Sequence, residues 1–120
     1  MGDMRLGAVE TRFAEIIWQN APVSTGTLVK LAQEHLSWKR TTTYTVLKRL
    51  CEKGLFRTEN SIVEVVIDRE TFYARQSEEY VEESFGGSLP AFLAAFSRGK
   101  RLDDRELDEL QRLIDSHRKG

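Results

Sequence analysis

The sequence has few of the residues from which disulfide frameworks, membrane spans and secretion signals are built. Its 120 residues contain one cysteine, Cys51, so no disulfide and no cysteine-based zinc cluster can form within the chain. No stretch approaches about 18 consecutive apolar residues, and the first residues lack the apolar core of a signal peptide. We therefore expect a cytoplasmic protein that neither crosses a membrane nor is secreted.

Recognisable catalytic and metal-binding patterns are also missing. The sequence has no glycine-rich phosphate loop, no Ser/Cys/His constellation and no pair of carboxylates in a plausible cleft. His35 and His117 have no second histidine or cysteine at metal-ligand spacing. We therefore expect no enzymatic activity, no metal and no cofactor.

The charged residues are nearly balanced in number but unevenly placed. The net charge is −1, yet residues 1–58 contain nine Lys or Arg and five Asp or Glu, whereas residues 59–120 contain nine and fourteen. Six of the cations lie between residues 37 and 57, where Glu52 is the only acidic residue. Such a segment suits the binding of a polyanion. A solvated basic surface would have the same composition, so charge alone leaves both interpretations open.

The first half of the chain predicts three helices followed by a hairpin. Apolar residues recur at helical spacing in three segments, which are residues 7–19, from Ser24 or Thr25 to about His35, and residues 39–53. After Gly54, which suits the left-handed position behind a helix, the pattern becomes that of two strands around the polar turn Glu59–Ser61. Val23 can add a short extended pairing. Three helices and a hairpin in this order predict a winged helix-turn-helix, whose third helix enters a DNA major groove.

The third predicted helix has two unlike faces. Projection at about 100° per residue groups Thr43, Val46, Leu47 and Leu50 on one buried side. The outward side carries hydroxyl groups, cations and one aromatic ring. Threonines lower helix propensity, so their presence here costs helix stability. We therefore expect this surface to serve binding. The candidate DNA contacts are residues of this surface together with Arg57 in the hairpin, which is the wing of the predicted fold. They are Arg40, Thr41, Thr42, Tyr44, Thr45, Lys48, Arg49 and Arg57.

The second half predicts an acidic helical region. Three helices are expected to begin after Asp68, Ser88 and Asp103, each of which can cap a helix, the last with Glu106 in a capping box. Their apolar stripes are thin and cannot cover one another well, so we expect them to pack against the same helices of a second copy. The candidate dimerisation residues are Phe72, Tyr80, Phe85, Leu89, Phe92, Leu93, Phe96, Leu107, Leu110 and Ile114.

Together these patterns predict a mainly α-helical protein with a small β-hairpin. Residues 1–68 are expected to form a winged helix-turn-helix DNA-binding domain, and residues 69–120 a helical dimerisation region.

Four segments in a fixed order carry a resemblance to a known family. They are Glu15–Trp18, Trp38–Leu55, Gly86–Leu89 and the leucine-spaced final helix. In this order, the chain resembles the BlaI/MecI/CopY (penicillinase repressor) family over nearly everything from Leu6 to Ile114. The resemblance implies a homodimeric transcriptional repressor that binds a double-stranded DNA operator of two-fold symmetry. It also implies release by a stress or antibiotic signal, through a membrane sensor protease or the signal downstream of it.

Two departures from the family limit what carries over. Copper-responsive members end in cysteine pairs, whereas no cysteine follows Cys51, so copper sensing is not expected. In β-lactam-responsive members the cleaved bond is an Asn-Phe step in the helix after the glycine pair. The matching step here is Ala95-Phe96, which lacks the asparagine. Proteolysis at that step and the binding of a small-molecule ligand both stay open.

A different class of function competes with DNA binding. In this alternative, the winged helix is a protein–protein interaction module whose basic third helix docks an acidic partner, and no DNA is bound. A gel-shift titration at two salt concentrations distinguishes the two, because phosphate contacts make DNA binding steeply dependent on salt.

Overall fold

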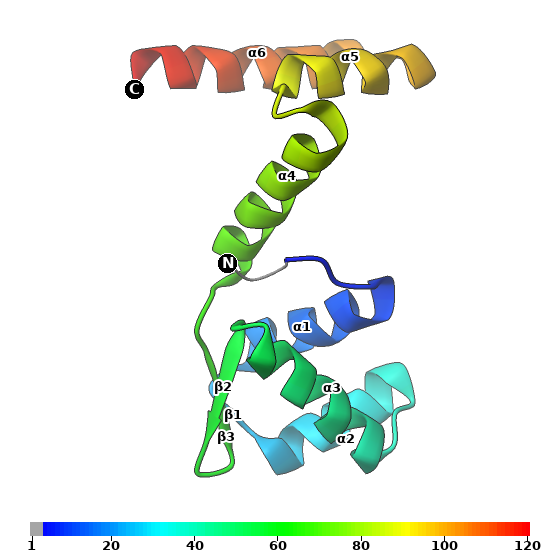
Figure 1. Ribbon diagram of the computed structural model, residues 1–120, viewed down its shortest axis with the longest axis vertical. Helices are drawn as coiled ribbons and strands as arrows, with labels where there is room; N and C mark the ends of the chain where they lie inside the picture. The colour runs from blue at the N-terminus through cyan, green and yellow to red at the C-terminus, as the bar shows by residue number, and fades with distance from the viewer. Residues whose placement is uncertain (1–3) are drawn as a thin grey trace. The chain divides into compact units, whose positions relative to one another are not determined.

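The computed structural model describes residues 4–120, which form six α-helices and one three-stranded antiparallel sheet (Figure 1). The helices are α1 (Ala8–Asn20), α2 (Thr25–Leu36), α3 (Arg40–Glu52), α4 (Arg69–Phe85), α5 (Leu89–Gly99) and α6 (Asp104–Lys119). The strands are β1 (Val23–Ser24), β2 (Phe56–Glu59) and β3 (Ile62–Val65). Within the described residues, no helix combines the length and apolarity needed to span a membrane. The predicted fold class, mainly helical with a small hairpin, is confirmed.

The contacts divide the chain into two compact units, which we describe separately. The N-terminal unit runs to Glu79 and the C-terminal unit comprises residues 80–120. The N-terminal unit therefore continues beyond the predicted domain boundary at residue 68, which stays a prediction. Residues 1–3 of the predicted DNA-binding domain lie outside the described residues.

The core of the N-terminal unit lies among α1, α2, α3 and the sheet (Figure 1). The buried residues of α3 are Thr43, Val46, Leu47 and Leu50, which confirms the predicted inner side of that helix. Thr43 is polar, but its hydroxyl donates a 3.0 Å hydrogen bond to the Lys39 carbonyl, so its burial leaves no polar group unsatisfied. The opposite side of α3 is thereby held outward.

The sheet has the strand order β1-β3-β2. The pairing expected of Val23 is confirmed, since it lies opposite Val63. In the hairpin, Glu59 pairs with Ile62, which leaves a two-residue turn in which Asn60 and Ser61 have φ of 52° and 62°. Positive φ at both central residues matches the twist of a tight hairpin. The wing is consequently short.

A tight turn joins α2 to α3. Ser37 closes α2 in the left-handed conformation, with φ of 58°, and its N–H bonds to the Ala32 and Gln33 carbonyls. Trp38 follows, and its ring centre lies 4.9 Å from that of Phe13 in α1. At the other end of α2, Ser24 caps the helix by accepting a 3.1 Å hydrogen bond from the Thr27 N–H. Both ends of α2 are therefore fixed, and with them the start of α3.

The first turns of α4 are attached to α1 by polar contacts. Arg69 Nε donates to both carboxylate oxygens of Glu15 at 2.8 and 2.9 Å, and the Tyr73 hydroxyl donates to Glu15 at 2.7 Å. The hydrogen bond from Arg69 lowers the pKa of Glu15, whereas burial is the main cause of the raised pKa of Tyr73. Trp18 Nε1 donates to the Ile67 carbonyl at 3.0 Å. These bonds hold the start of α4 on the N-terminal unit.

The structure corrects one predicted dimerisation residue in this region. Phe72 has no exposed surface, and its ring centre lies 5.4 Å from that of Trp18. Because the core of the N-terminal unit already surrounds it, Phe72 stabilises the monomer and cannot contact a second copy directly.

The C-terminal unit lacks a buried core of its own. None of residues 80–120 is buried, and its aromatic rings form an open cluster in which Phe92 lies 5.4 Å from Phe85 and 5.9 Å from Tyr80 between ring centres. Gly86 and Gly87 have φ of 58° and 84°, which lets the chain leave α4 in a sharp turn. The predicted capping box at the start of α6 is confirmed for Asp103 and Glu106.

Candidate nucleic-acid interface

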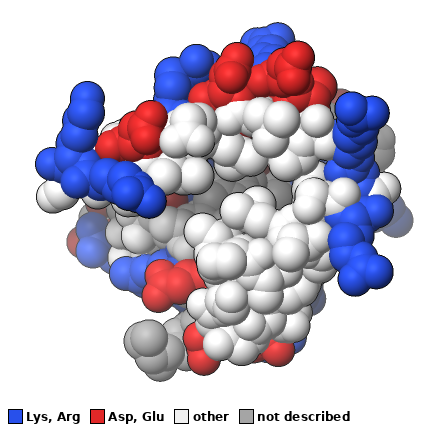
Figure 2. Space-filling model, turned by 90° about the horizontal axis from the view of Figure 1, so that it is seen from above, with Lys and Arg blue, Asp and Glu red and all other residues white. Residues whose placement is uncertain are grey.

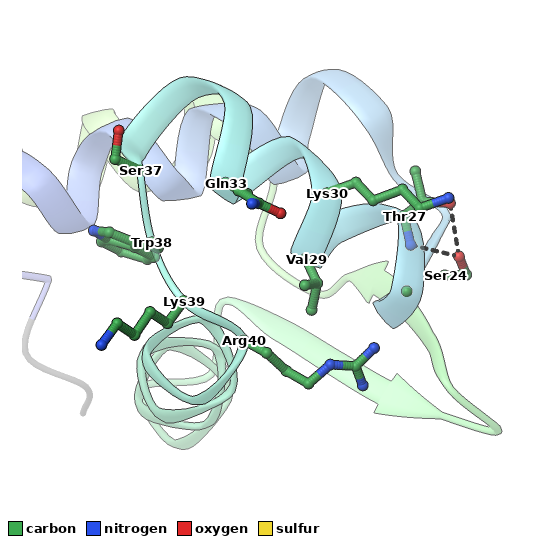
Figure 3. Close-up of a pocket in the computed structure, with 10 residues that line it drawn as sticks. Ser24, Thr27, Val29, Lys30, Gln33, Ser37, Trp38, Lys39 and Arg40 are labelled. Atoms are coloured by element: carbon green, nitrogen blue, oxygen red, sulfur yellow. Dashed lines mark hydrogen bonds between the residues drawn. The ribbon is translucent and has the colours of Figure 1, made fainter.

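A basic groove lies between α2 and the start of α3 (Figure 3). It encloses about 1000 Å³ and is lined by Ser24, Gly26, Thr27, Val29, Lys30, Gln33, Ser37, Trp38, Lys39 and Arg40. Three of these residues are cations, and no Asp or Glu is among the lining residues that the structure describes. A groove with this composition attracts anions.

Arg40 and Lys39 stand at the first turn of α3, and their side chains extend in different directions (Figure 3). The guanidinium carbon of Arg40 lies 5.9 Å from the centre of the Tyr44 ring. A cation over an aromatic face is attracted by the ring quadrupole, so Tyr44 restrains Arg40 without neutralising its charge. The charge of Arg40 therefore remains available to a ligand.

The groove also includes the N-terminus of α2, where the helix dipole places partial positive charge. Here the Ser24 hydroxyl donates to Thr27 Oγ1 at 2.9 Å. The wing is tied to the same point, because the Thr25 N–H donates to the Ser61 carbonyl at 2.9 Å. Helix N-termini of this kind hold phosphate oxygens in many proteins.

The outward surface of α3 presents the predicted contact residues to solvent. Exposed side chains on this helix include Thr41, Thr42, Tyr44, Thr45 and Lys48. The Thr45 hydroxyl donates to the Thr41 carbonyl at 2.9 Å. Within residues 4–120, neither the Lys48 ammonium nor the hydroxyls of Thr41 and Thr42 have a hydrogen-bond or ion-pair partner. These groups can bond to a ligand without first breaking a bond within the protein.

Two of the predicted DNA contacts, Arg49 and Arg57, are already paired within the protein. Arg49 Nη1 lies 3.1 Å from Glu10 Oε2, and the pKa of Glu10 is lowered, first by the hydrogen bond from the Gly7 backbone and then by Arg49. Arg57 Nη2 lies 3.0 Å from Glu64 Oε2, on the neighbouring strand. Both guanidinium groups are exposed, but their charges are offset locally. They are weaker candidates for phosphate contact than Lys48.

Of the ten residues that line the groove, only Arg40 was among the predicted DNA contacts, and the long polar side chains not predicted from the sequence are Lys30, Gln33 and Lys39. Lys30 and Gln33 are on the solvent side of α2, and Lys39 immediately precedes α3. The sequence signal for Lys30 and Gln33 was their place on the polar face of the second predicted helix. That face indicates a binding surface only once the second helix is known to lie beside the start of the third.

No metal site accompanies the groove. In the part of the chain that the structure describes, no three or more His, Cys, Asp or Glu residues are gathered closely enough to hold a metal ion. Cys51 is half-buried, and its sulfur lies 3.7 Å from Thr58 Oγ1.

Comparison with known proteins identifies a family for most of the chain. The family described as penicillinase repressor matches residues 6–116 of the chain, a span that includes every residue of the groove. None of the curated proteins compared with the chain matches it.

Proposed function

The chain belongs to the penicillinase repressor family of DNA-binding transcriptional repressors, and from this premise we propose that it acts as a homodimer on a two-fold symmetric operator. In this proposal the N-terminal unit binds one half-site through α3 and the groove beside it. The C-terminal unit joins the two copies. A symmetric dimer matches a palindromic site because each copy presents the same surface to one half of it.

The observation that carries the DNA-binding part is the set of unpaired polar groups around the start of α3. Arginine can pair with the guanine edge, and a threonine methyl can pack on the thymine methyl, so we assign base contacts to Arg40, Thr41 and Thr45. Lysines more often serve as point charges for phosphate. We therefore assign phosphate contacts to Lys30, Lys39 and Lys48.

The homodimer is supported by the apolar surface of the C-terminal unit. Its exposed large apolar side chains are Tyr80, Leu89, Phe96, Leu107, Leu113 and Ile114, which are 43 to 56% exposed. A groove of about 490 Å³ between α5 and α6 is lined mainly by Phe and Leu side chains. The space-filling view shows a broad uncharged area with acidic and basic side chains at its margins (Figure 2). Large exposed apolar patches mark interaction sites, and a second copy is the partner that operator symmetry requires.

We further propose that an inducing signal, such as stress or an antibiotic, acts on the C-terminal unit, where a membrane sensor protease or its downstream signal would separate the copies. Ala95 and Phe96 are exposed within α5. A helical peptide bond becomes accessible to a protease only after local unwinding. Cleavage at Ala95-Phe96 stays a prediction, tested by mass spectrometry of the chain after induction.

The proposed function is tested by sequence selection from random duplexes, followed by footprinting and sedimentation. We expect enrichment of an inverted repeat, protection of both half-sites and a sedimentation mass of two chains. A scrambled duplex of the same length and composition serves as the control. Equal binding to selected and scrambled duplexes would contradict operator recognition. Absence of any duplex binding at low salt would favour the alternative of an acidic protein partner.

A further inference from the structure

We infer that, in the homodimer, α6 of one copy packs antiparallel against α6 of the other, so that its acidic first half faces the basic second half of its partner. This inference rests on the proposed homodimer and adds the direction and register of the pairing. It follows from three features of α6. The helix has an uncovered apolar seam, its charges are unevenly distributed along its length, and the apolar residues and the charges are centred on nearly the same point of the helix.

The apolar seam consists of Leu107, Leu110 and Ile114. Their spacing of three and then four residues is that of one side of a paired helix. Leu107 and Ile114 are each 47% exposed, so the fold of one copy leaves them uncovered. Helix α5 faces the neighbouring flank of α6 across the apolar groove, which is lined by Leu113 and also by Leu110 at the edge of the seam. One side of α6 therefore remains open to a second helix.

The charges of α6 are separated along its length. Residues 103–109 contain five Asp or Glu and one Arg, whereas residues 112–119 contain three Lys or Arg and one Asp. Some are satisfied within the helix, since Arg105 bonds to Glu109 at 3.2 Å and Gln111 to Asp115 at 3.0 Å. Among residues 4–120, Asp104 and Arg118 have no ion-pair partner. Unpaired negative charge therefore stands near the start of α6, and unpaired positive charge near its end.

The direction of pairing decides whether these charges attract or repel. In a parallel, in-register pair, each residue faces its own counterpart, so Asp104 would face Asp104 and Arg118 would face Arg118. In an antiparallel pair, Asp104 of one copy faces Arg118 of the other, twice by symmetry. The helix dipoles also oppose one another in that arrangement, which brings each positive end beside a negative end.

The midpoints of the apolar and charged patterns lie within half a residue of one another. Leu107 and Ile114 are symmetric about the centre of the seam, between residues 110 and 111, and Asp104 and Arg118 are symmetric about residue 111. A single two-fold axis near Gln111 therefore places Leu107 against Ile114 and Asp104 against Arg118 in the same register. Both sets of contacts form together only when the helices are antiparallel.

Disulfide cross-linking of the full-length protein tests the direction. In a Cys51→Ser background, we would prepare Leu107→Cys and Ile114→Cys chains, oxidise each alone, and oxidise an equal mixture after subunit exchange. We expect little cross-linking of either chain alone and efficient cross-linking in the mixture. Arg105→Cys, on the side of α6 away from the seam, is the matched control and should not cross-link. Sedimentation and duplex binding of each reduced chain report folding and dimerisation independently.

Charge reversal gives a second measurement. Asp104→Arg alone should weaken dimerisation about tenfold, because two weak attractions at the rim become repulsions, and adding Arg118→Asp to it should restore the original dissociation constant. Self-linking of Leu107→Cys alone, in a protein that still sediments as a dimer, would overturn the antiparallel direction while leaving the homodimer intact. A dimer that gives no cross-link in any mixture would place the interface elsewhere. A monomeric protein would overturn the homodimer itself.

Discussion

Replacement of Lys48 by glutamine should make operator binding less dependent on salt. In each copy, four cations on α2, at the start of α3 and on the outward side of α3 lack a carboxylate partner within the described residues, and they are Lys30, Lys39, Arg40 and Lys48. Arg40 is assigned to a base, so if each of the three lysines neutralises one phosphate, a dimer displaces counterions from six phosphates, which gives a slope of log affinity against log salt of about −5. Lys48→Gln removes two of them and makes the slope shallower by about 1.8.

The assay is fluorescence anisotropy with the selected operator between about 50 and 200 mM salt, where the parent should lose about three powers of ten in affinity and Lys48→Gln about two. The control is the double variant Arg57→Gln/Glu64→Gln, which removes an ion pair of 3.0 Å without changing net charge. That variant should keep the parental slope. An unchanged slope for Lys48→Gln, or a shallower one for the control, would refute the assignment of phosphate contacts from unpaired charges.

Three further predictions concern the N-terminal unit. Leu50→Ala should lower the free energy of unfolding by about 2 to 5 kcal/mol in urea titrations, because Leu50 has no exposed surface and its loss leaves a cavity; a smaller loss would mean that the core collapses around the site. Trp18→Phe should cost about 1 kcal/mol in the same assay, since it removes the hydrogen bond to the Ile67 carbonyl. The hydrogen bond from Arg69 lowers the pKa of Glu15, so the ionised Glu15 carboxylate stabilises the folded state. This stabilisation is complete above the ordinary pKa of 4.5 and is lost as the pH falls through the lowered pKa. Glu15→Gln should therefore differ from the parent in melting temperature at pH 7 but approach it in strong acid, and a constant difference across that range would contradict the argument.

Much of the fold could be predicted from the sequence because its local signals agree with one another. The helix start at Ser24 or Thr25, the helix end at Gly54 and the capping box at Asp103 each involve residues close together in the chain. The structure confirms all three and makes Ser24 the cap. The pairing of Val23 required more, since its partner Val63 is far along the chain. It was predictable because an extended residue between Pro22 and a helix has few other places to form hydrogen bonds.

The candidate site was less predictable because its electrostatics depend on distant residues. Periodicity placed Arg49 on the outward side of α3, but its partner Glu10 belongs to α1, and only the packing of the two helices brings them together. The prediction that Phe72 belongs to a dimer interface was wrong for a related reason. Its apolar character and helical spacing suited a dimer interface equally well, and its contact with Trp18 decides the matter in favour of the core.

The short wing explains why the groove beside α2 matters for the proposed DNA contacts. The turn of the wing consists of Asn60 and Ser61, neither of which is a cation, and Arg57 is held by Glu64. The wing therefore has little positive charge to offer a phosphate. Three of the four unpaired cations lie instead on α2 and at the start of α3, so in the proposed complex we expect the DNA backbone to be held mainly on that side of α3. Shortening the wing should then change affinity less than replacing Lys30, and the opposite order in a binding titration would move the phosphate contacts back to the hairpin.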